Sequence, residues 1–524
     1  MTFTRRTLLI GSAVALAVPA SASATAAPKR FDPVRVRGWA KDTWRSLVAM
    51  TPSGTGLPAD NIPESLAAGD RSGYTSPTNI GGYLWSTVVA RELGFISKDE
   101  ASARLVRTLS TLDRMEHHVP SGMYFNWYDE ETGAALRAWP GTGAVVHPFC
   151  SSVDNGWLGA ALLVVAGADR AAADLARRIF ARMRWDAFYN PGDVAGHPAV
   201  RPGGLIHGGF FPFDHDRPGG VYQGTHIGGE PVWLTNHHYD TTVSETRITS
   251  YLGIITGQVP PKQYFAMWRT FPASCDWSWH EMQPVGENRT YYGIEVFEGA
   301  YTYRGMRIVP GWGGSMFEEL MPDVFVPEAR WAPKSWGRNH PLHVRAQREH
   351  GLLEAKYGCW GFSPSSNPAG GYREYGVDAL GLGPGNEPGN GANGYFSDQE
   401  MTNYDVGFGT CRPATAPTPT YGDGVVTPHA AFLAMMHERD EAFANLARIQ
   451  DDLRAYGRGG FFDAVAVRSG TIARRYLSLD QAMVMGAIGN VLCRDVIRRA
   501  FSTPAVERAL RPVIGVEEFG ASRV

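Results

Sequence analysis

Three acidic side chains stand in sequence settings where a carboxyl group can do chemistry. Glu245 follows a run rich in Asn, His and Tyr, Asp154 lies in the run Ser-Ser-Val-Asp-Asn-Gly-Trp, and Asp463 ends the run Gly-Gly-Phe-Phe-Asp. Cleavage of a glycosidic bond needs a carboxylic acid that protonates the leaving oxygen and a second carboxylate that attacks or activates water. Two of these acids at one cleft would therefore suit glycoside cleavage.

The setting of Glu245 favours the general acid. Burial by the neighbouring Tyr239 and Trp233 would raise the pKa of the carboxyl, as proton donation at neutral pH requires. Glu245 also heads a predicted apolar helix that Ser244 or Thr242 could cap, and a helix N-terminus would lower the same pKa. An ordinary first-turn glutamate is the structural alternative. We assign Glu245 the acid role.

For the base, Asp463 is the leading candidate, because a short aromatic loop between two helices can hold a carboxylate at the mouth of a helical barrel. Asp154 competes with it, although Asp154 could instead be the N-cap of its own helix. Asp129 follows Trp127-Tyr128 and has the pattern of a sugar clamp. Its alternative is a turn residue before Thr132-Gly133.

Several polar and aromatic side chains of these stretches are candidates for sugar contacts. Trp312 precedes two glycines, which would let its indole lie exposed for stacking, or it could simply fill the core. Glu318 lies in an apolar helical stretch, where a buried acid needs a partner such as Arg247 or a substrate hydroxyl. The complete set of predicted substrate-binding residues is Asn79, Asn126, Asp129, Trp157, His238, Tyr239, Arg247, Trp312 and Glu318.

Composition narrows the class of partner. The 524 residues include 49 basic and 52 acidic side chains, a net charge of −3, which lacks the basic excess that nucleic-acid or anionic-membrane binding needs. Aromatic residues make up 11% of the chain, which suits flat polyhydroxylated ligands. The five cysteines include no C-x-x-C pair, so we expect no metal site and at least one unpaired thiol. The oligomeric state stays open.

The N-terminus has the pattern of an export signal. Arg5-Arg6 precede the apolar run 8–18 and the small residues Ala22-Ser23-Ala24. The paired arginines favour the twin-arginine route. We expect residues 1–27 to be this signal and the mature protein to be secreted, periplasmic or in the cell envelope, without a membrane span.

Helical periodicity dominates the rest of the chain and predicts an all-α fold. About twelve helices, separated by long Gly/Pro-rich connections at 190–231, 275–310 and 381–419, would form a single domain over 28–524. In an (α/α)6 barrel such loops would gather at one end and shape a cleft. The predicted helices are 33–50, 79–94, 98–115, 154–167, 170–184, 243–257, 263–271, 347–357, 428–437, 440–456, 480–492 and 494–510.

Eight segments, in order, resemble the glucoamylase-like group that includes glycoside hydrolase family 144 (endo-β-1,2-glucanases) and the transglycosylation domain of cyclic β-1,2-glucan synthases. The resemblance implies an (α/α)6 barrel, hydrolysis or transfer at a glucan, and chemistry without a metal or organic cofactor. It also strengthens the assignment of Glu245. The segments are 75–81 (TSPTNIG), 125–129 (FNWYD), 151–157 (SSVDNGW), 244–247 (SETR) with 257–260 (GQVP), 312–322 (WGGSMFEELMP), 360–363 (WGFS), 425–428 (VVTP) and 460–463 (GFFD).

One position departs from part of the group. In the cyclic-glucan transferases the motif at 360–364 reads Trp-Gly-Ile-Ser-Glu, and that glutamate looks like the nucleophile of a retaining mechanism. Here the position is Pro364, which has no group to attack with, and Glu374 is a weaker substitute. The hydrolases of family 144 also lack this glutamate and look inverting. The proline therefore predicts an inverting hydrolase with Asp463, or failing it Asp154, as base.

Other functions remain open at this stage. A polysaccharide lyase could use Asn236, His237, His238, Tyr239 and Arg247, although mixed charges in the loops do not suit a uronate. A non-catalytic sugar-binding protein would explain Pro364 but not the retained acids. The glycan could also differ from β-1,2-glucan, since that linkage follows only from the resemblance. Endo and exo action are both compatible with the sequence.

Overall fold

The computed structural model describes residues 30–192, 202–213, 222–271, 282–382, 396–397, 411 and 421–523. The predicted export signal lies outside these residues. Within them the chain is mainly helical, with fifteen α-helices joined by short strands. Among the described helices, none combines the length and the apolar character that crossing a bilayer requires.

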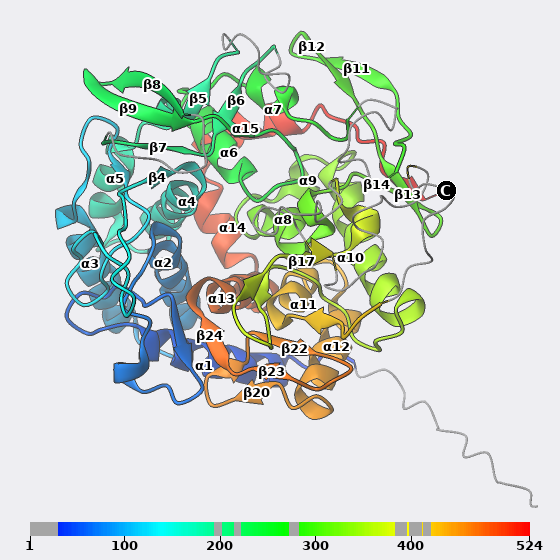
Figure 1. Cartoon of the computed structure of the whole chain (residues 1–524), viewed down its shortest axis with the longest axis horizontal. Coiled ribbons are helices and arrows are strands. Elements are labelled where there is room, and N and C mark those ends of the chain that lie inside the picture. Colours follow the sequence, from blue (N-terminus) through cyan, green and yellow to red (C-terminus); the bar gives the residue numbers. More distant parts are fainter. Residues whose placement is uncertain are drawn as a thin grey trace, which may run out of the picture.

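The helices form two layers (Figure 1). In the inner layer α2 packs against α4 and α13, α4 against α6, and α11 against α8 and α13. Each inner helix carries one outer helix: α3 on α2, α5 on α4, α15 on α6, α10 on α8, α12 on α11 and α1 on α13. The inner helices are α2 (Pro77–Glu92), α4 (Ser152–Ala168), α6 (Arg247–Ile255), α8 (Met316–Leu320), α11 (Pro428–Ala434) and α13 (Ser478–Leu492). The outer helices are α1 (Pro33–Met50), α3 (Lys98–Arg114), α5 (Ala173–Arg182), α10 (Trp336–Glu349), α12 (Arg439–Asp451) and α15 (Pro504–Ile514).

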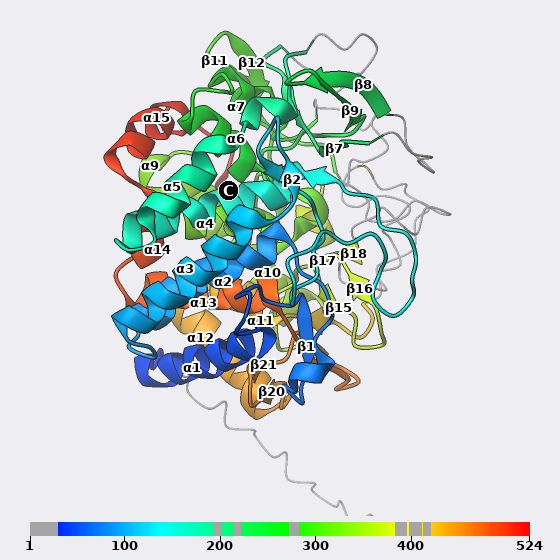
Figure 2. The same cartoon turned by 90° about the vertical axis from the view of Figure 1, so that its left-hand side faces the viewer.

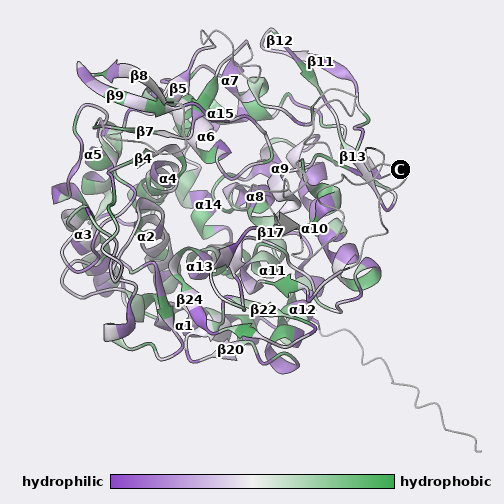
Figure 3. Ribbon diagram, in the orientation of Figure 1, coloured by the Kyte–Doolittle hydropathy of each residue, from purple (hydrophilic) through white to green (hydrophobic). Residues whose placement is uncertain are grey.

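The inner helices are buried around nearly their whole circumference, whereas the peripheral α3 mixes hydrophobic and hydrophilic segments (Figure 3). Glycines allow this close packing. A Cβ added at Gly81 of α2 would lie 3.1 Å from the carbonyl oxygen of Trp157 in α4, and one at Gly82 would lie 2.7 Å from Ala482 Cβ in α13. The contact at Gly82 is closer than real Cβ atoms show and the one at Gly81 is tight, so glycine at these positions favours the close packing of α2 on both faces.

Most helix predictions are confirmed to within a few residues, because caps and apolar spacing are local signals. The first helix begins and ends as expected, with the Asp32 carboxylate accepting the N–H groups of Val34 and Arg35. Other predictions are wrong in part. The helix expected over 243–257 begins only at Arg247, and those expected over 263–271 and 440–456 end early, at Ala266 and Asp451. The stretch expected over 347–357 overlaps only the end of α10 (Trp336–Glu349) and continues as a π-helix over His350–Glu354. The helix expected over 494–510 is two, α14 (Val496–Phe501) and α15, because Pro504 begins a new first turn.

The long connections contain short strands that the all-α prediction left out. Figure 2 shows many of these strands on one side of the molecule, with α1, α3, α5 and α14 toward the other. The strand bounds relevant to the site are β1 (Asn61–Pro63), β4 (Cys150–Ser151), β5 (Tyr189–Asn190), β6 (Leu205–His207), β7 (Gly209–Phe211), β8 (Tyr222–Ile227), β9 (Glu230–Thr235), β10 (His238–Tyr239), β15 (Ser365–Ser366), β16 (Tyr372–Arg373), β17 (Tyr375–Gly376), β18 (Phe396–Ser397), β22 (Ala464–Ala466) and β24 (Arg475–Leu477).

The strands pair locally into small sheets. The largest has the order β4-β7-β9-β8, and β1 pairs with β24 so that residues more than 400 positions apart lie side by side. The remaining helices and strands are α7 (Lys262–Ala266), α9 (Glu328–Trp331), β2 (His117–His118), β3 (Met123–Tyr124), β11 (Asn288–Tyr291), β12 (Ile294–Phe297), β13 (Tyr301–Tyr303), β14 (Met306–Ile308), β19 (Val425–Val426), β20 (Tyr456–Gly457), β21 (Gly460–Phe461), β23 (Ile472–Ala473) and β25 (Ser522–Arg523).

The cysteines agree with the prediction that at least one thiol stays unpaired. Cys150, Cys359 and Cys493 are free thiols. Cys411 is disulfide-bonded, and its partner lies outside the described residues.

Candidate active site

The starts of α2, α4 and α8 and the turn before α6 are joined by three short hydrogen bonds. The Asp154 carboxylate accepts the Thr78 hydroxyl at 2.6 Å, which joins α4 to the start of α2. The indole N–H of Trp157 donates to Glu245 Oε2 at 2.6 Å. The backbone N–H of Glu245 donates to Glu318 Oε2, also at 2.6 Å. Three carboxyl groups from separate segments therefore lie together.

A second group of acids lies at the starts of α11 and α13 and the edge of β22. Asp463 Oδ2 accepts the backbone N–H of Ser366 at 2.6 Å, and the Asp463 side chain hydrogen-bonds with that of Asp480. His429 Nδ1 lies 3.1 Å from Asp480 Oδ2. Burial, then the neighbouring Asp480 carboxyl, raises the pKa of Asp463 well above its usual range.

Asp60 connects the two groups. Its carboxylate accepts the side-chain N–H groups of Asn79 at 2.9 Å and Asn61 at 3.0 Å. Its negative charge adds to burial in raising the pKa values of both Asp154 and Asp480, the latter to about 7. The Asp60 carbonyl also accepts the backbone N–H at the start of α13. We call Asp60, Asp154, Glu245, Glu318, Glu374, Asp463 and Asp480 together the acid cluster.

The segment 363–366 links the part of the cluster around Glu318 to the part around Asp463. The backbone N–H of Phe317 donates to Ser363 Oγ at 3.2 Å, next to Glu318, and the N–H of Ser366 donates to Asp463. These two contact points are three residues apart, at most about 10 Å of extended chain. Pro364 lies buried between them. The position that carries a glutamate in the transferases thus lies between the candidate acid and the candidate base.

Glu245 has the electrostatics of a proton donor. Its side chain is 9% exposed, and burial, then the charge of Glu318, raises its pKa well above the usual range, while the Trp157 hydrogen bond lowers it. The expected cap by Ser244 or Thr242 is wrong, because α6 begins two residues after Glu245 and no side-chain cap bond forms. Glu245 therefore lies outside the first turn, where the helix dipole acts most strongly.

Asp154 does not cap its own helix. Ser151 is the N-cap of α4, and its hydroxyl accepts the backbone N–H of Asp154 at 3.2 Å. The Asp154 carboxyl instead reaches Thr78, and burial raises its pKa despite bonds from Thr78 and Ser151 that lower it. Asp154 stays available as the alternative base.

Three residues predicted to bind sugar are buried and hold other groups instead. Trp157 is 1% exposed, its ring packs on Phe325, and its N–H is taken by Glu245. Arg247 is 0% exposed and pairs with Glu328, and Asn79 donates to Asp60 from a buried position. In the structure these three side chains contact protein groups of the acid cluster and its surroundings, and the sugar contacts predicted for them stay predictions.

The other predicted contacts differ in position. Tyr239 belongs to the cluster, since burial and then the charges of Glu245, Asp154 and Glu318 raise the pKa of its phenol. His238 Nε2 lies 2.9 Å from the Asn190 amide.

Asp129 acts as a turn residue, the alternative named above. Its Oδ1 accepts the N–H and the hydroxyl of Thr132, each at 2.8 Å. Asn126 is anchored through its backbone N–H to Phe149, and its buried Oδ1 has no hydrogen-bond donor among the described residues. Trp312 is partly buried and opens a short turn in which Gly313 and Gly314 have positive φ. Their predicted sugar contacts stay predictions.

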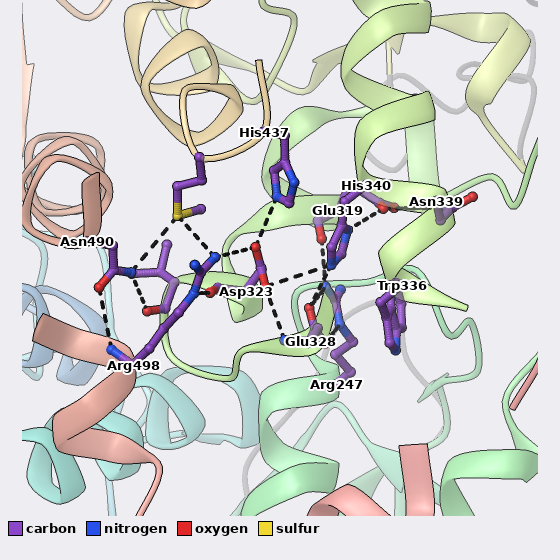
Figure 4. Close-up of polar contacts among 12 residues, drawn as sticks. Arg247, Glu319, Asp323, Glu328, Trp336, Asn339, His340, His437, Asn490 and Arg498 are labelled. Carbon is purple, nitrogen blue, oxygen red and sulfur yellow. Dashed lines mark hydrogen bonds and ion pairs between the residues drawn. The ribbon is translucent and has the colours of Figure 1, made fainter. Parts of the chain in front are cut away.

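A buried ion network around Arg247, Glu328 and His340 connects to the segments that carry Glu245 and Glu318 (Figure 4 shows the network). Arg247 donates to both oxygens of Glu328 at 2.8 Å, and Tyr251 donates to the same carboxylate at 2.6 Å. The same guanidinium donates to the carbonyl oxygens of Ser244 at 2.9 Å and Glu318 at 2.7 Å. Because Arg247 holds both backbones, it fixes the relative position of the two segments that carry the acids.

Asp323, Glu328 and His340 place possible metal-ligand atoms within 4.8 Å of one another. The charges there are already balanced by protein groups, since Arg498 contacts Asp323 at 2.5 Å and Arg247 pairs with Glu328. Burial alone would lower the pKa of His340, but the three neighbouring carboxylates raise it to about 9, so the ring is a third cation. The donor set therefore fits a structural ion network better than a divalent cation.

Sequence reasoning missed Asp60, Asp480, His429 and Ser366. Asp480 begins a predicted helix, where acidic residues are common for the helix dipole alone, so its type carried no separate signal. Asp60 lies in a loop, and only the pairing of β1 with β24 brings it close to Asp480. These residues become recognisable once the chain brings them together.

Comparison with known proteins gives the family. The sequence model of a family described as Putative glucoamylase matches residues 237–504, slightly more than half of the chain. A second model, described as a protein of unknown function (DUF3131), matches residues 38–204. The cyclic β-(1,2)-glucan synthase NdvB of Rhizobium meliloti is 24% identical over 599 residues, which cover 90% of this chain but only 18% of that protein.

Solved structures share the fold at low sequence identity. The endo-β-1,2-glucanase from Chitinophaga pinensis, solved with sophorotriose and glucose, matches with a TM-score of 0.59 and 16% identity, over 92% of this chain and 98% of that chain. The β-1,2-glucanase from Parabacteroides distasonis matches with a TM-score of 0.61 and 16% identity, over 92% of this chain and 60% of that chain. With its acid cluster, its two helical layers and a family match over half its length, this chain belongs to the glucoamylase-like family.

Proposed function

We propose that the protein is a glycoside hydrolase that cleaves a glucan, in the first instance β-1,2-glucan, with inversion of configuration. The observation that carries the proposal is a series of contacts that links buried Glu245, through Glu318 and the segment 363–366, to a second buried carboxyl, Asp463. Related chains that act on or synthesise β-1,2-glucan support the substrate. We also propose that the two helical layers form an (α/α)6 barrel in one domain that follows an export signal.

The proposed reaction uses two proton transfers. Glu245 gives its proton to the glycosidic oxygen as the bond to the anomeric carbon breaks. Asp463 takes a proton from a water molecule, whose oxygen attacks the opposite face of the same carbon. Asp463 Oδ2 accepts the Ser366 N–H, and the Asp463 side chain also hydrogen-bonds with Asp480, so we assign the water to the Asp463–Asp480 pair, with Asp463 as the group that takes its proton. Asp154 is the alternative base.

Pro364 supports inversion over retention. A retaining enzyme needs a nucleophile about 5–5.5 Å from the acid, whereas inversion leaves roughly 6.5–9.5 Å for water. The proline offers no nucleophile at the position between the two acids. Glu374 is the remaining rival, because its charge adds to burial in raising the pKa of Glu318 to about 7. A lyase is disfavoured, since Arg247 is buried against Glu328 and is not available to neutralise a uronate.

The test is a panel of linear glucans with product sizing, followed by proton NMR of the first reducing end released. We expect cleavage of β-1,2-glucan with the α-anomer formed first. Cleavage of another glycan would overturn only the substrate. A β-anomer formed first, or a glycosyl-enzyme trapped on Glu374, would show retention. Ultraviolet absorbance from an unsaturated product would show a lyase, and binding without turnover would show a sugar-binding protein.

A further inference from the structure

Glu318 lies at the centre of the contacts around Glu245. It is the third residue of α8, is 4% exposed, and its own N–H is satisfied by Ser315 Oγ at 3.2 Å. Its carboxylate accepts the Glu245 backbone N–H at 2.6 Å and a side-chain hydrogen bond from Ser244. Glu318 therefore contacts the segment of Glu245 from the neighbouring helix.

Arg247 fixes the backbone on both sides of the contact between Glu245 and Glu318. Arg247 donates to the carbonyl oxygen of Glu318 at 2.7 Å and to that of Ser244 at 2.9 Å. Since Arg247 also makes a bidentate pair with Glu328, most of its positive charge is already compensated. It lowers the pKa of Glu245 less than Glu318 raises it.

The groups that face Glu245 come from every element packed against it. Glu318 in α8 and Asp154 in α4 add negative charge, and Arg247 in α6 adds positive charge. Tyr239 of β10 is a neutral phenol, because burial and these acids raise its pKa far above neutral. The charge of Glu374, which follows β16, raises the pKa of Glu318 and is not among the main influences on the pKa of Glu245.

The order in which the two glutamates ionise follows from these surroundings. Burial is the largest influence on both, but Glu318 also accepts hydrogen bonds from Glu245 and Ser244, which favour its charged form. Glu245 accepts one such bond, from the Trp157 indole, and faces the negative charges of Glu318 and Asp154, which together with burial raise its pKa well above its usual range. Glu318 therefore loses its proton first, and its charge then opposes ionisation of Glu245.

We propose that Glu318 is a positioning residue for the general acid: it holds the Glu245 backbone and, through its negative charge, keeps the Glu245 side chain protonated at neutral and mildly alkaline pH. This role rests on the proposed function. It replaces the sugar contact that the sequence predicted for Glu318. A general acid is active only while protonated, so Glu318 sets the alkaline limit of activity.

The test is the pH dependence of kcat/KM for Glu318→Gln. The amide oxygen still accepts the Glu245 N–H, but the charge is gone. We expect the alkaline limb to move to lower pH by about one unit or more, with activity below the limb within a few-fold of wild type and KM nearly unchanged. Glu116→Gln, which removes an exposed carboxylate paired with Arg137, is the matched control and should leave the limb in place.

Three results would overturn the proposal. A uniform loss of activity with an unmoved limb would show a purely structural role, and a rise in KM alone would show a sugar contact. If Glu318→Gln does not fold, Glu318→Asp takes its place: the shorter side chain holds its charge farther from Glu245, so a smaller move of the limb to lower pH supports the proposal and an unmoved limb contradicts it. Glu245→Gln tests the proposed function separately from the role of Glu318. Full activity of that variant would refute the assignment of Glu245 as the acid, whatever the result for Glu318.

Discussion

At the scale of single residues, the roles proposed for the carboxyl groups, acid for Glu245 and base for Asp463, follow from the groups that surround each of them. Glu245 and Asp463 are both buried acids with raised pKa values, yet the neighbours of Glu245 keep its proton in place, while Asp463 shares its surroundings with a second acid, Asp480. Two facing carboxyl groups in a buried site hold one proton between them more readily than two charges. The hydrogen bond between them lowers the pKa of Asp480 and raises that of Asp463, so the shared proton lies on Asp463 and must pass to Asp480 before Asp463 can take a proton from water.

The first prediction concerns the acid. Glu245→Gln should lower kcat by about 10²–10⁴-fold, because the amide cannot deliver a proton. Binding should persist, since the amide keeps the shape and can still accept the Trp157 indole N–H. Initial rates on linear β-1,2-glucan and calorimetry with a non-cleaved oligosaccharide measure the two effects. Glu131→Gln, an exposed acid paired with Arg71, is the control. A variant with wild-type kcat would refute the assignment.

The second prediction decides between the two candidate bases. Asp463→Asn should lose activity by about 10²–10⁴-fold. Asp154→Asn should lose much less, because Asp154, bonded to Thr78, lies next to Glu245, whereas the base must act on the opposite face of the sugar. Added azide should partly restore the activity of Asp463→Asn with a glycosyl azide as product, since the anion replaces the activated water. The reverse order of damage in the two variants would transfer the base role to Asp154.

At the scale of elements, the close approach of α4 and α6 sets the position of the acid. A Cβ added at Gly156 would lie 2.4 Å from Thr249 Oγ1 and 3.1 Å from Ile248 Cγ2. Thr249 cannot simply turn away, because its hydroxyl donates to the Ser152 carbonyl oxygen. Gly156 directly precedes Trp157, which donates to Glu245, so the packing of the two helices and the geometry of the site are coupled.

The third prediction follows from this contact. Gly156→Ala should destabilise the protein by about 1–3 kcal/mol through overpacking and should lower kcat as Trp157 shifts. Gly38→Ala is the matched control, because a Cβ at this exposed helical position of α1 meets nothing within 4 Å. Replacing that glycine should stabilise α1 by about 0.5–1 kcal/mol. Thermal unfolding and initial rates of both variants provide the comparison, and equal effects would refute the packing argument.

At the scale of the whole molecule, buried charges away from the site control stability. Glu298 is 1% exposed, and burial, then the neighbouring Glu517, raises its pKa to about 8 although Arg269 lowers it. Glu517, near the C-terminus, pairs with Arg269 and accepts the Tyr264 hydroxyl. The end of the chain is thereby tied to the segment after α6.

The fourth prediction is a loss of stability at alkaline pH. A carboxyl whose folded pKa is raised favours folding below its unfolded value of about 4.3, and that contribution is lost as pH rises through about 8. Glu298→Gln should therefore reduce the fall in melting temperature between about pH 6 and pH 9. Glu295→Gln, an exposed position on β12, should not alter it. Parallel melting curves for Glu298→Gln and wild type across this range would contradict the assignment.

The sequence by itself determined the local elements and the leading acid. Apolar spacing and caps such as Asp32 and Ser97 are short-range signals, so the extents of α1 and α3 are readable to within one residue. The family is readable for the same reason, because its motifs are contiguous runs. Asp463 emerged from such a run as well. The split at Pro504 was missed because apolar periodicity continues across it.

Only the tertiary structure decided which side chains form the acid cluster and which support it. Asp480 and Asp60 lie more than 400 residues apart and influence one another through the pairing of β1 with β24. Trp157 and Arg247, predicted to contact sugar, are both buried against protein groups, because the face that a helix start presents depends on its neighbours. Residue types and spacing encode periodicity, whereas burial and the sharing of protons arise only when distant segments pack.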